Sequence, residues 1–393
     1  MGQNGVGSSV MRLTRSTRTA DAAFILKCTR RCNLRCTYCR DRRGVEYPQF
    51  EVSLVAALLE AVAGDPDINS ACLIWHGGEP LLLGLPFFRK AKYLEDHLLA
   101  GRKSIQNILQ TNACLLTDEW ADHFVEYGFQ LGISLDGPPE LQDFYRPMAS
   151  GQGSFRRCME GVRILQEHGV RFGVLTVVSE DLLELGPENL MAFFEGISIL
   201  QYALLPMRKR WERSAQAIVY NRRCGEYLSG IADLWLRRDD PHLRIRELDS
   251  KLDRFFGLPH RVCKDAGQCV GKYFGVEPDG SVWHCDKFFD DPRFYLGNIL
   301  DTPISDLRGS RQMQDLLAIE TSFRNRCKEC KWFHLCGGGC LYDSIQQAKI
   351  GGNPGSADCV DFAVFETLSV LLACSPPLLE TAFGDDIPGV AFL

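Results

Sequence analysis

Three cysteines lie within eight residues of one another in the segment CNLRCTYC, as Cys32, Cys36 and Cys39. Three thiolates on one loop cannot complete the four-ligand shell of a structural zinc site. They suit a [4Fe–4S] cluster with one iron left open, because cysteine thiolates are the usual cluster ligands and a missing fourth leaves a coordination position. The spacing therefore predicts an iron–sulfur centre at which chemistry can take place.

A second group of cysteines follows residue 255. Its members are Cys263, Cys269, Cys285, Cys327, Cys330, Cys336, Cys340 and Cys359. Eight thiols are enough for two four-thiolate sites, and Cys-x2-Cys pairs are typical of metal ligation. Taken without the N-terminal motif, this spacing fits two structural zinc sites as well as two clusters.

The remaining cysteines give a different signal. They are Cys28, Cys72, Cys114, Cys158, Cys224 and Cys374, and most lie in apolar runs, as expected of small core residues. The total of seventeen is odd. Disulfides are rare in cytosolic proteins, where clustered cysteines more often bind metal, so metal–sulfur ligation is the favoured interpretation.

Short apolar runs alternate with amphipathic stretches through the first 237 residues. The predicted strands are Ala23–Cys28, Ala71–His76, Ser104–Gln110, Phe129–Leu135, Val170–Val178 and Ile197–Leu205. The predicted helices include Val52–Ala63, Pro86–Leu99, Asp118–Tyr127, Phe155–His168 and Ala215–Leu236. Strands separated by helices indicate βαβ units and a parallel sheet. Six such units predict an α/β fold, a partial (β/α)6 TIM-like barrel, with its active site in the loops after the strands.

Polar residues follow four successive predicted strands. The three-cysteine loop follows the first, and His76-Gly77-Gly78-Glu79-Pro80 follows the second. The third ends in Gln110-Thr111-Asn112, and the fourth in Ser134-Leu135-Asp136-Gly137-Pro138. The two glycines allow a ligand to approach the backbone, and Glu79 offers a carboxylate to an ammonium group. Asn112 and Asp136 fit ordinary turns equally well.

Composition narrows the class of protein. Hydrophobic residues make up 45% of the chain and charged residues 24%, which are ordinary globular values. A net charge of −6 provides no electrostatic footprint for nucleic acid. The first twenty residues contain no continuous apolar core of a secretory signal, and no run approaches the ~18 apolar residues of a membrane span. A cytoplasmic location with no membrane or nucleic-acid partner is therefore expected.

The CNLRCTYC and GGEP segments together resemble the radical S-adenosylmethionine superfamily, whose signature is C-x3-C-x2-C. The resemblance implies that the open iron binds the amino and carboxylate groups of S-adenosylmethionine, and that Gly77, Gly78, Glu79 and Pro80 contact that amine. Reductive cleavage would then give a 5′-deoxyadenosyl radical that takes a hydrogen atom from substrate. By position, Ser134 and Arg146 match cofactor contacts of related maturases; a surface arginine is the alternative for Arg146.

The later cysteine spacing resembles the SPASM domain, which carries two auxiliary [4Fe–4S] clusters with interleaved ligands. Carried over by position, Cys263, Cys269, Cys285 and Cys340 would hold the first cluster, and Cys327, Cys330, Cys336 and Cys359 the second. The resemblance thus implies three [4Fe–4S] clusters. Interleaved ligands would link metal binding to folding of the whole domain.

These patterns divide the chain into five parts. They are a flexible lead-in (1–21), a radical S-adenosylmethionine barrel (22–240), a bridging region (241–262), an auxiliary-cluster domain (263–365) and a C-terminal tail (366–393). A helix is predicted at Phe362–Ala373, followed by the apolar segment Pro376–Leu393, for which burial or contact with another chain is expected.

Asp286 directly follows Cys285, at the position of the proposed base of sulfatase maturases. Desolvation and nearby negative charge would raise the pKa of its carboxyl, which suits a general base. A solvent-facing loop aspartate in the stretch Asp286–Asp291 is the alternative. His284 and His76 are as well explained by packing as by chemistry.

From about residue 24 to 365 the chain resembles anaerobic sulfatase-maturating enzymes. Two positions depart from them: His76 stands where glutamine is usual, near the peptide substrate, and Arg40-Asp41 stand where an aromatic or aliphatic residue is usual. His-Gly-Gly-Glu-Pro is common among maturases of ribosomally made peptides. The first hypothesis is therefore a peptide maturase, an oxidoreductase that oxidises or cross-links a side chain; the second makes formylglycine from Cys or Ser on a sulfatase. Both imply a flavodoxin- or ferredoxin-type electron donor.

Two further hypotheses differ in class. A small-molecule dehydrogenase or epimerase, for example of an aminoglycoside, needs a closed pocket, whereas a peptide maturase needs an open channel. Fewer than twenty-five residues precede the first predicted strand, which weakens the case for a leader-binding domain at that end. A non-catalytic zinc scaffold is distinguished by the absence of cluster absorbance near about 400 nm in an anaerobic sample.

Overall fold

One mixed sheet crosses the whole molecule. The computed structural model describes residues 20–39, 48–208, 214–289 and 291–374. In that part of the chain the strand order is β10-β9-β8-β1-β2-β3-β4-β5-β6-β7. The strands are β1 (Ala22–Lys27), β2 (Ser70–His76), β3 (Ser104–Thr111), β4 (Gln130–Ser134), β5 (Phe172–Val178), β6 (Gln201–Pro206), β7 (Arg244–Ile245), β8 (Tyr273–Val276), β9 (Ser281–His284) and β10 (Tyr295–Asn298).

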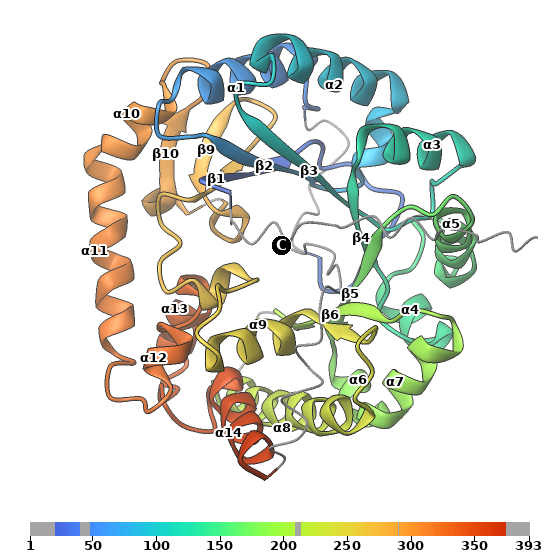
Figure 1. The fold of residues 1–393 in the computed structure, drawn as a ribbon, viewed down its shortest axis with the longest axis vertical. Coiled ribbons are helices and arrows are strands. Elements are labelled where there is room, and N and C mark those ends of the chain that lie inside the picture. Colours follow the sequence, from blue (N-terminus) through green and yellow to red (C-terminus); the bar gives the residue numbers. More distant parts are fainter. Residues whose placement is uncertain (1–19, 40–47, 209–213, 290, 375–393) are drawn as a thin grey trace, which may run out of the picture.

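Helices cover the outside of this curved sheet, and Figure 1 shows them as a ring around the strands. They are α1 (Val52–Gly64), α2 (Leu85–Leu99), α3 (Asp118–Tyr127), α4 (Pro139–Tyr145), α5 (Phe155–Glu167), α6 (Glu180–Leu185), α7 (Pro187–Gly196), α8 (Ser214–Arg238), α9 (Arg246–Phe255), α10 (Ile304–Gly309), α11 (Arg311–Asn325), α12 (Phe333–Cys336), α13 (Leu341–Lys349) and α14 (Val360–Cys374).

The predicted partial barrel is confirmed. The strands β1 to β6 run parallel in chain order, and each lies within a few residues of its predicted range. Helix α3 has the predicted bounds because its start and end are marked in the sequence. Asp118 and Glu119 place negative charge in its first turn, and Gly128 ends it in the left-handed conformation (φ 66°).

The second half of the chain extends the same sheet, which the sequence did not predict. Strand β8 pairs in parallel with β1, with Phe274 opposite Phe24, and β9 and β10 continue antiparallel. Cys285 follows β9 directly, so the sheet itself carries this cysteine next to the barrel. The predicted cysteine-rich second domain is therefore continuous with the barrel sheet.

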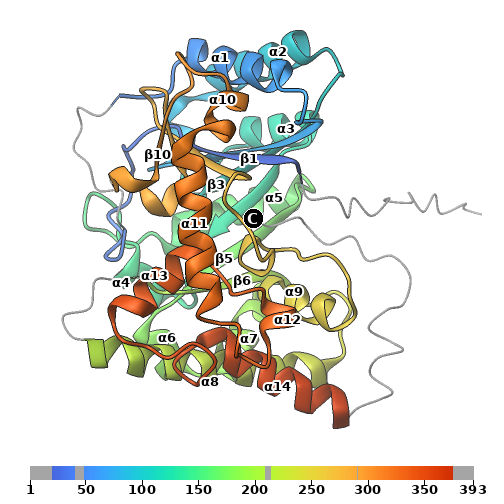
Figure 2. The same ribbon diagram turned by 90° about the vertical axis from the view of Figure 1, so that its left-hand side faces the viewer.

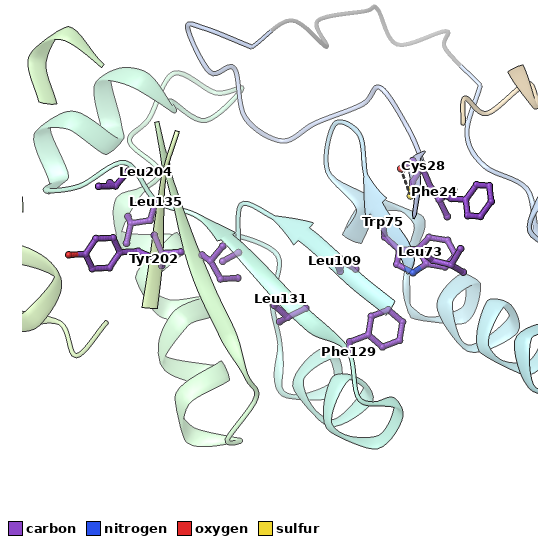
Figure 3. Close-up of a cluster of buried hydrophobic side chains, with 14 of the residues drawn as sticks. Phe24, Cys28, Leu73, Trp75, Leu109, Phe129, Leu131, Leu135, Tyr202 and Leu204 are labelled. Carbon is purple, nitrogen blue, oxygen red and sulfur yellow. Dashed lines mark hydrogen bonds between the residues drawn. The ribbon is translucent and has the colours of Figure 1, made fainter. Parts of the chain in front are cut away.

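Alternate residues of the strands face opposite sides, as the period of two requires. One side packs against the helices and forms the main core, which Figure 3 shows with Phe24, Leu73, Trp75, Leu109 and Tyr202 among its members. Trp75 keeps its indole N–H satisfied inside this core by donating to Asn107 Oδ1 at 2.8 Å. The other side holds a smaller apolar cluster of Ala23, Ile25, Cys72, Ile74 and Ile108. This inner face leads along β1 and β2 to Lys27 and His76.

The C-terminal helix α14 packs along α8, and Figure 2 shows the two side by side. A Cβ on Gly225 of α8 would lie 2.9 Å from Ala363 Cβ, so the small residue permits the close approach. The predicted helix Phe362–Ala373 is thus confirmed within α14. The segment Pro376–Leu393, most of the lead-in 1–21 and Arg40-Asp41 lie outside the described residues. Within the described helices, none is long and apolar enough to cross a membrane.

Candidate active site

The three-cysteine loop follows β1 and is held against the loop after α4. Leu34 forms an antiparallel bridge with Met148, and the backbone N–H of Arg35 donates to Pro147 O at 2.8 Å. A third bond runs from Thr37 N to Tyr145 O at 2.8 Å. These backbone bonds fix the path of the segment that presents the cysteines.

The three thiols of this loop lie close enough for their charges to affect one another. Burial raises the pKa of Cys32 to about 12, and Glu79, Cys36 and Cys39 raise it further. Burial also raises the pKa of Cys36, which Arg146 opposes. Protonated thiols must lose their protons to ligate metal, so iron binding here is coupled to proton release. The donor set fits a three-thiolate cluster site.

Gly77 and Gly78 lie directly on the backbone that leads into the cysteine loop. Gly78 N donates to Thr29 O at 2.6 Å, and Glu79 N to Arg31 O at 2.9 Å. A Cβ on Gly77 would lie 2.4 Å from Thr29 O, and one on Gly78 would lie 2.0 Å from Arg31 O. The two glycines therefore allow the second strand end to pack against the cysteine loop; the close approach is made by the protein's own backbone.

Replacing Gly78 by Ala should separate these two loops. The new Cβ would meet backbone atoms, which cannot move aside cheaply, so we expect a loss of about 1–3 kcal/mol in the free energy of unfolding. Denaturant unfolding measures this loss. Gly64→Ala is the matched control, because nothing lies within 4 Å of its added Cβ. Equal stabilities of the two variants would contradict the packing role of Gly78.

Glu79 is buried (1% exposed) and joins the ends of β2 and β3. Its Oε1 accepts from Leu81 N at 3.1 Å and from Thr111 Oγ1 at 2.8 Å, and its Oε2 accepts from Asn112 N at 2.9 Å. Burial raises the pKa of Glu79 to about 7 against these three bonds. A carboxylate accepts about four hydrogen bonds, so these three bonds leave room for one further donor at Oε2.

Asn112 and Asp136 both bond residues of the cysteine loop, and Asn112 Oδ1 also accepts from Cys114 N at 3.0 Å, as in the ordinary turn considered as its alternative. Asn112 donates to Asn33 Oδ1 at 2.8 Å and lies 3.9 Å from Cys32 Sγ, so it connects β3 to the cysteine loop. Asp136 is 1% exposed and accepts two bonds from Arg146, at 2.9 and 3.0 Å. Tyr38, inside the cysteine motif, also donates to Asp136.

Arg146 and Ser134 lie on the same side of the cysteine loop. The Arg146 guanidinium lies 5.3 Å from the centre of the Tyr38 ring as well as on Asp136. Ser134 ends β4, and its backbone oxygen lies 3.9 Å from Cys158 Sγ. Arg146 is therefore a buried partner of the cluster loop (8% exposed), not the surface arginine considered as its alternative.

The eight later cysteines lie near one another in the auxiliary-cluster half, and their division into two ligand sets stays a prediction. Burial raises the pKa of Cys269, and the nearby thiols Cys340, Cys285 and Cys263 raise it further, after Glu320. In the other group, burial raises the pKa of Cys359 to about 12, and Cys327 is among its neighbours. One cleft is lined by Cys327, Cys330, Cys336 and Cys359 together with Cys340.

The spacing of these groups bears on the kind of metal centre. Among the described side chains, no group of three or more His, Cys, Asp or Glu is placed to hold one metal ion. Four thiols are the donor set of a [4Fe–4S] cluster, so the residues of each predicted set fit such a cluster by type and number.

Asp286 enters the barrel interior and meets the inner face of β1 and β2. Its Oδ2 lies 3.9 Å from Lys27 Nζ, and Lys27 in turn lies 3.3 Å from His76 Nδ1. The Asp286 side chain is 27% exposed and that of Lys27 only 3%. Asp286 is therefore not a purely solvent-facing loop aspartate, because the buried Lys27 faces its carboxylate.

The predicted rise in the pKa of Asp286 is also wrong. Burial does raise it, but Lys27, His76 and Lys287 outweigh burial and hold the pKa of Asp286 at about 2. The carboxylate is therefore ionised at neutral pH and can accept a proton without first losing one. Its low pKa makes it a weak base, so its proton donor must itself become acidic during the reaction.

Several residues of this interior were missed by sequence reasoning. Lys27 is the last residue of a strand, and Lys287 follows Asp286. Arg208, two residues after β6, makes two bonds of 2.9 Å to Asp343. For each of these residues, the sequence offered one signal: a basic residue stands at or near the end of a strand, or beside a candidate metal ligand.

The comparisons with known proteins agree with this geometry. Residues 26–184 match the radical SAM superfamily, and residues 263–331 match an iron–sulfur cluster-binding domain. A serine-type anaerobic sulfatase-maturating enzyme of Bacteroides thetaiotaomicron is 30% identical over 348 residues, covering 82% of this chain and 83% of that protein. The chain belongs to the radical SAM/SPASM family that includes the anaerobic sulfatase-maturating enzymes.

Two further relatives of this radical SAM/SPASM protein are informative. A cysteine-type anaerobic sulfatase-maturating enzyme of Clostridium perfringens is 29% identical, covering 79% of this chain and 85% of that protein. The solved structure described as native anSMEcpe with bound AdoMet and Cp18Cys peptide has a TM-score of 0.76 and 24% identity. It covers 92% of this chain and 98% of that chain, which shows a shared fold.

Proposed function

We propose that the protein is a radical SAM maturase that oxidises or cross-links a side chain of a peptide or protein substrate. The observation that carries the proposal is the meeting of Asp286, from the auxiliary-cluster half, with Lys27 and His76 inside the barrel. When bound, a [4Fe–4S] cluster and S-adenosylmethionine supply a 5′-deoxyadenosyl radical that removes a hydrogen atom from the substrate. The Asp286 carboxylate, beside the inner face of β1 and β2, can accept the proton that the substrate must also lose.

The residues proposed to hold the cofactors are those that match the family motifs. Cys32, Cys36 and Cys39 would hold the cluster that binds S-adenosylmethionine. Gly77 to Pro80 would contact the cofactor amine through the free position on Glu79 Oε2, and Ser134 and Arg146 would lie along the cofactor. The two groups of four later cysteines would hold two auxiliary clusters, giving three in all.

The residues around Asp286 would handle the substrate proton. Asp286 accepts it, because the carboxylate is ionised and partly exposed. Lys27 keeps that carboxylate ionised and in place. Gly77 N donates to His76 Nδ1 at 2.6 Å and Lys27 lies on the same nitrogen, so a neutral His76 ring carries its proton on Nε2. His76 thereby offers a donor where relatives tend to have glutamine.

The direct test is an anaerobic reaction of the reconstituted protein with S-adenosylmethionine, dithionite and a library of peptides rich in Ser, Cys and aromatic residues. The expected result is 5′-deoxyadenosine together with a peptide that has lost two hydrogens. Tandem mass spectrometry distinguishes a cross-link within the peptide from an oxidised single residue. Cleavage of the cofactor with no altered peptide, but with an oxidised aminoglycoside, would instead support the small-molecule hypothesis.

The sulfatase relatives favour a second candidate, formylglycine formation from Ser or Cys. Oxidation of a Ser side chain to an aldehyde removes two hydrogens, one as an atom and one as a proton, plus one electron. The aldehyde reacts with hydrazides and a cross-link does not, so hydrazide labelling of the product separates the two candidates. Hydrazide-reactive product from a sulfatase-derived peptide would select formylglycine formation.

The affinity for S-adenosylmethionine should depend on the ionisation of Glu79. Burial raises the pKa of Glu79 to about 7, and its ionised form would bond the cofactor ammonium group more strongly than the neutral form. The dissociation constant should therefore rise as pH falls through 7, by up to about tenfold per unit. Isothermal titration between pH 6 and pH 8 measures it. Glu79→Gln should give a shallower profile, and an unchanged slope would remove Glu79 from cofactor binding.

The proposed reaction also implies an electron donor and a reducing compartment. A one-electron donor of flavodoxin or ferredoxin type would reduce the cluster held by the cysteine loop. A cytoplasmic location would suit the many thiols, because reducing pools keep cysteines out of disulfides.

A further inference from the structure

The segment from His284 to Lys287 supplies one proposed ligand of the first auxiliary set, Cys285, and also two side chains that lie near the other ligands. Cys285 has φ +61°, a backbone conformation that a residue with a side chain adopts at a cost of about 1–3 kcal/mol. The residues on either side of the turn, His284 and Lys287, both have nitrogen atoms near sulfurs of the other ligands. The turn therefore places two nitrogen groups around this thiol set.

Lys287 contacts the thiol set from the barrel side. Its Nζ lies 3.1 Å from Cys340 Sγ, within hydrogen-bonding reach of a sulfur. The charge of Lys287 also lies near Cys263 and Cys285, and at Cys285 the Asp286 carboxylate opposes it. One lysine thus lies close to three of the four proposed ligands.

His284 approaches the fourth ligand from the opposite side. Its Nε2 lies 3.7 Å from Cys269 Sγ, and its ring stacks on Phe288 and Phe294 with centroids 5.5 and 6.5 Å away. A backbone hydrogen bond also joins the ring to Tyr273. With its proton on Nε2 the ring would donate to the Cys269 sulfur, and this is the tautomer that the proposal assigns to it.

The second auxiliary set has a different environment. In the part of the chain that is described, no side chain donates to a sulfur of Cys327, Cys330, Cys336 or Cys359. The nearby Lys251 and Lys264 both bond Asp361 at 2.7 Å, so their charges are paired with a carboxylate. The N–H donors to this set are backbone groups, from Asp361 and Phe362 to Cys359. A lysine in direct contact with a ligand sulfur is thus a feature of the first set in the described part of the chain.

We propose that Lys287, supported by His284, makes the cluster held by Cys263, Cys269, Cys285 and Cys340 the more easily reduced of the two auxiliary clusters. Hydrogen bonds to cluster sulfurs and a nearby cation stabilise the reduced, more negative state, which raises the reduction potential. Lys287 is a positioning residue in this sense: it acts on the substrate only through the cluster next to Asp286. The inference rests on the proposed function, because it assumes that both clusters assemble.

The test is a redox titration of the full-length, reconstituted protein followed by electron paramagnetic resonance. In Lys287→Met, the potential of one auxiliary cluster should fall by at least the equivalent of a tenfold change in its equilibrium constant, about 59 mV for one electron. The other auxiliary cluster should keep its potential. Lys287→Arg should restore most of the shift, because it keeps the charge. Lys349→Met is the control, since it removes an exposed lysine from the helix after Cys340.

The outcomes separate this inference from the proposed function. Wild-type protein with about four iron atoms per chain, instead of about twelve, would contradict the three-cluster proposal itself. About twelve iron atoms with unshifted potentials in Lys287→Met would overturn only the role of Lys287. If Lys287→Met fails to retain the cluster, Lys287→Gln is titrated in its place, because it keeps an N–H donor without the charge. Wild-type potentials in that variant would likewise overturn the role of the charge.

Discussion

Replacing Cys32, Cys36 and Cys39 together by Ala is expected to abolish reductive cleavage of S-adenosylmethionine. The three thiols are neighbours on a loop whose backbone is fixed by bonds to residues 145–148, and without them that loop offers no thiolate to iron. Iron content should fall by about four atoms per chain while the auxiliary absorbance remains. Chromatography of 5′-deoxyadenosine after dithionite reduction measures the cleavage.

The matched control is Cys72→Ala, which removes a buried cysteine from β2. Cys72 packs in the small inner apolar cluster, so its loss should cost about 1 kcal/mol of stability and leave iron content and cleavage unchanged. Cleavage at the wild-type rate in the triple variant would show that the radical chemistry does not depend on this loop. Loss of cleavage in Cys72→Ala as well would show that the triple variant reports general damage.

Local sequence signals were sufficient for the barrel strands and their helices. Apolar runs of six to nine residues separated by amphipathic stretches placed β1 to β6, because parallel strands are buried on both faces. The same logic could not find β7, a two-residue strand, or the short helices α4 and α6. Elements of this length bury too few residues to show a period.

The joining of the two halves could not be read from local patterns. Strand β8 is four residues long, and its pairing with β1 depends on contacts such as the stacked rings of Phe24 and Phe274, with centroids 5.4 Å apart. Such pairing is determined by tertiary contacts, because it depends on which edge strand of the sheet is free to pair with a further strand. The cysteine spacing indicated a second domain but carried no information about this shared edge.

The pKa of Asp286 likewise could not be predicted from the local sequence. Desolvation beside a buried cluster, together with nearby negative charge, predicted a raised pKa for this carboxyl. In the structure Lys27 from β1 and His76 from β2 lie beside it and reverse the direction. The sign of a pKa shift depends on charges brought in by distant strands, which a local sequence pattern does not show.

Replacing Asp286 by Asn is expected to keep cofactor cleavage and to lose most of the peptide product. The cluster loop and Glu79 are untouched by the change, so 5′-deoxyadenosine should still form. Without the carboxylate the substrate proton has no acceptor beside Lys27, and removal of a general base costs about 10²–10⁴-fold in rate. The measured quantity is modified peptide formed per 5′-deoxyadenosine, and it should fall by at least about a hundredfold.

Two companion variants distinguish proton transfer from a structural role of Asp286. Asp291→Asn removes a carboxylate from the same stretch, one paired with exposed Arg293, and should leave product per cleavage unchanged. Asp286→Glu keeps an ionisable acceptor and should recover part of the coupling. Because Lys27 is buried and faces Asp286, the Asn variant also leaves a positive charge without its carboxylate. A loss that Asp286→Glu does not relieve, or that Lys27→Met relieves in the Asn variant, would assign Asp286 to charge balance and exclude it as the proton acceptor.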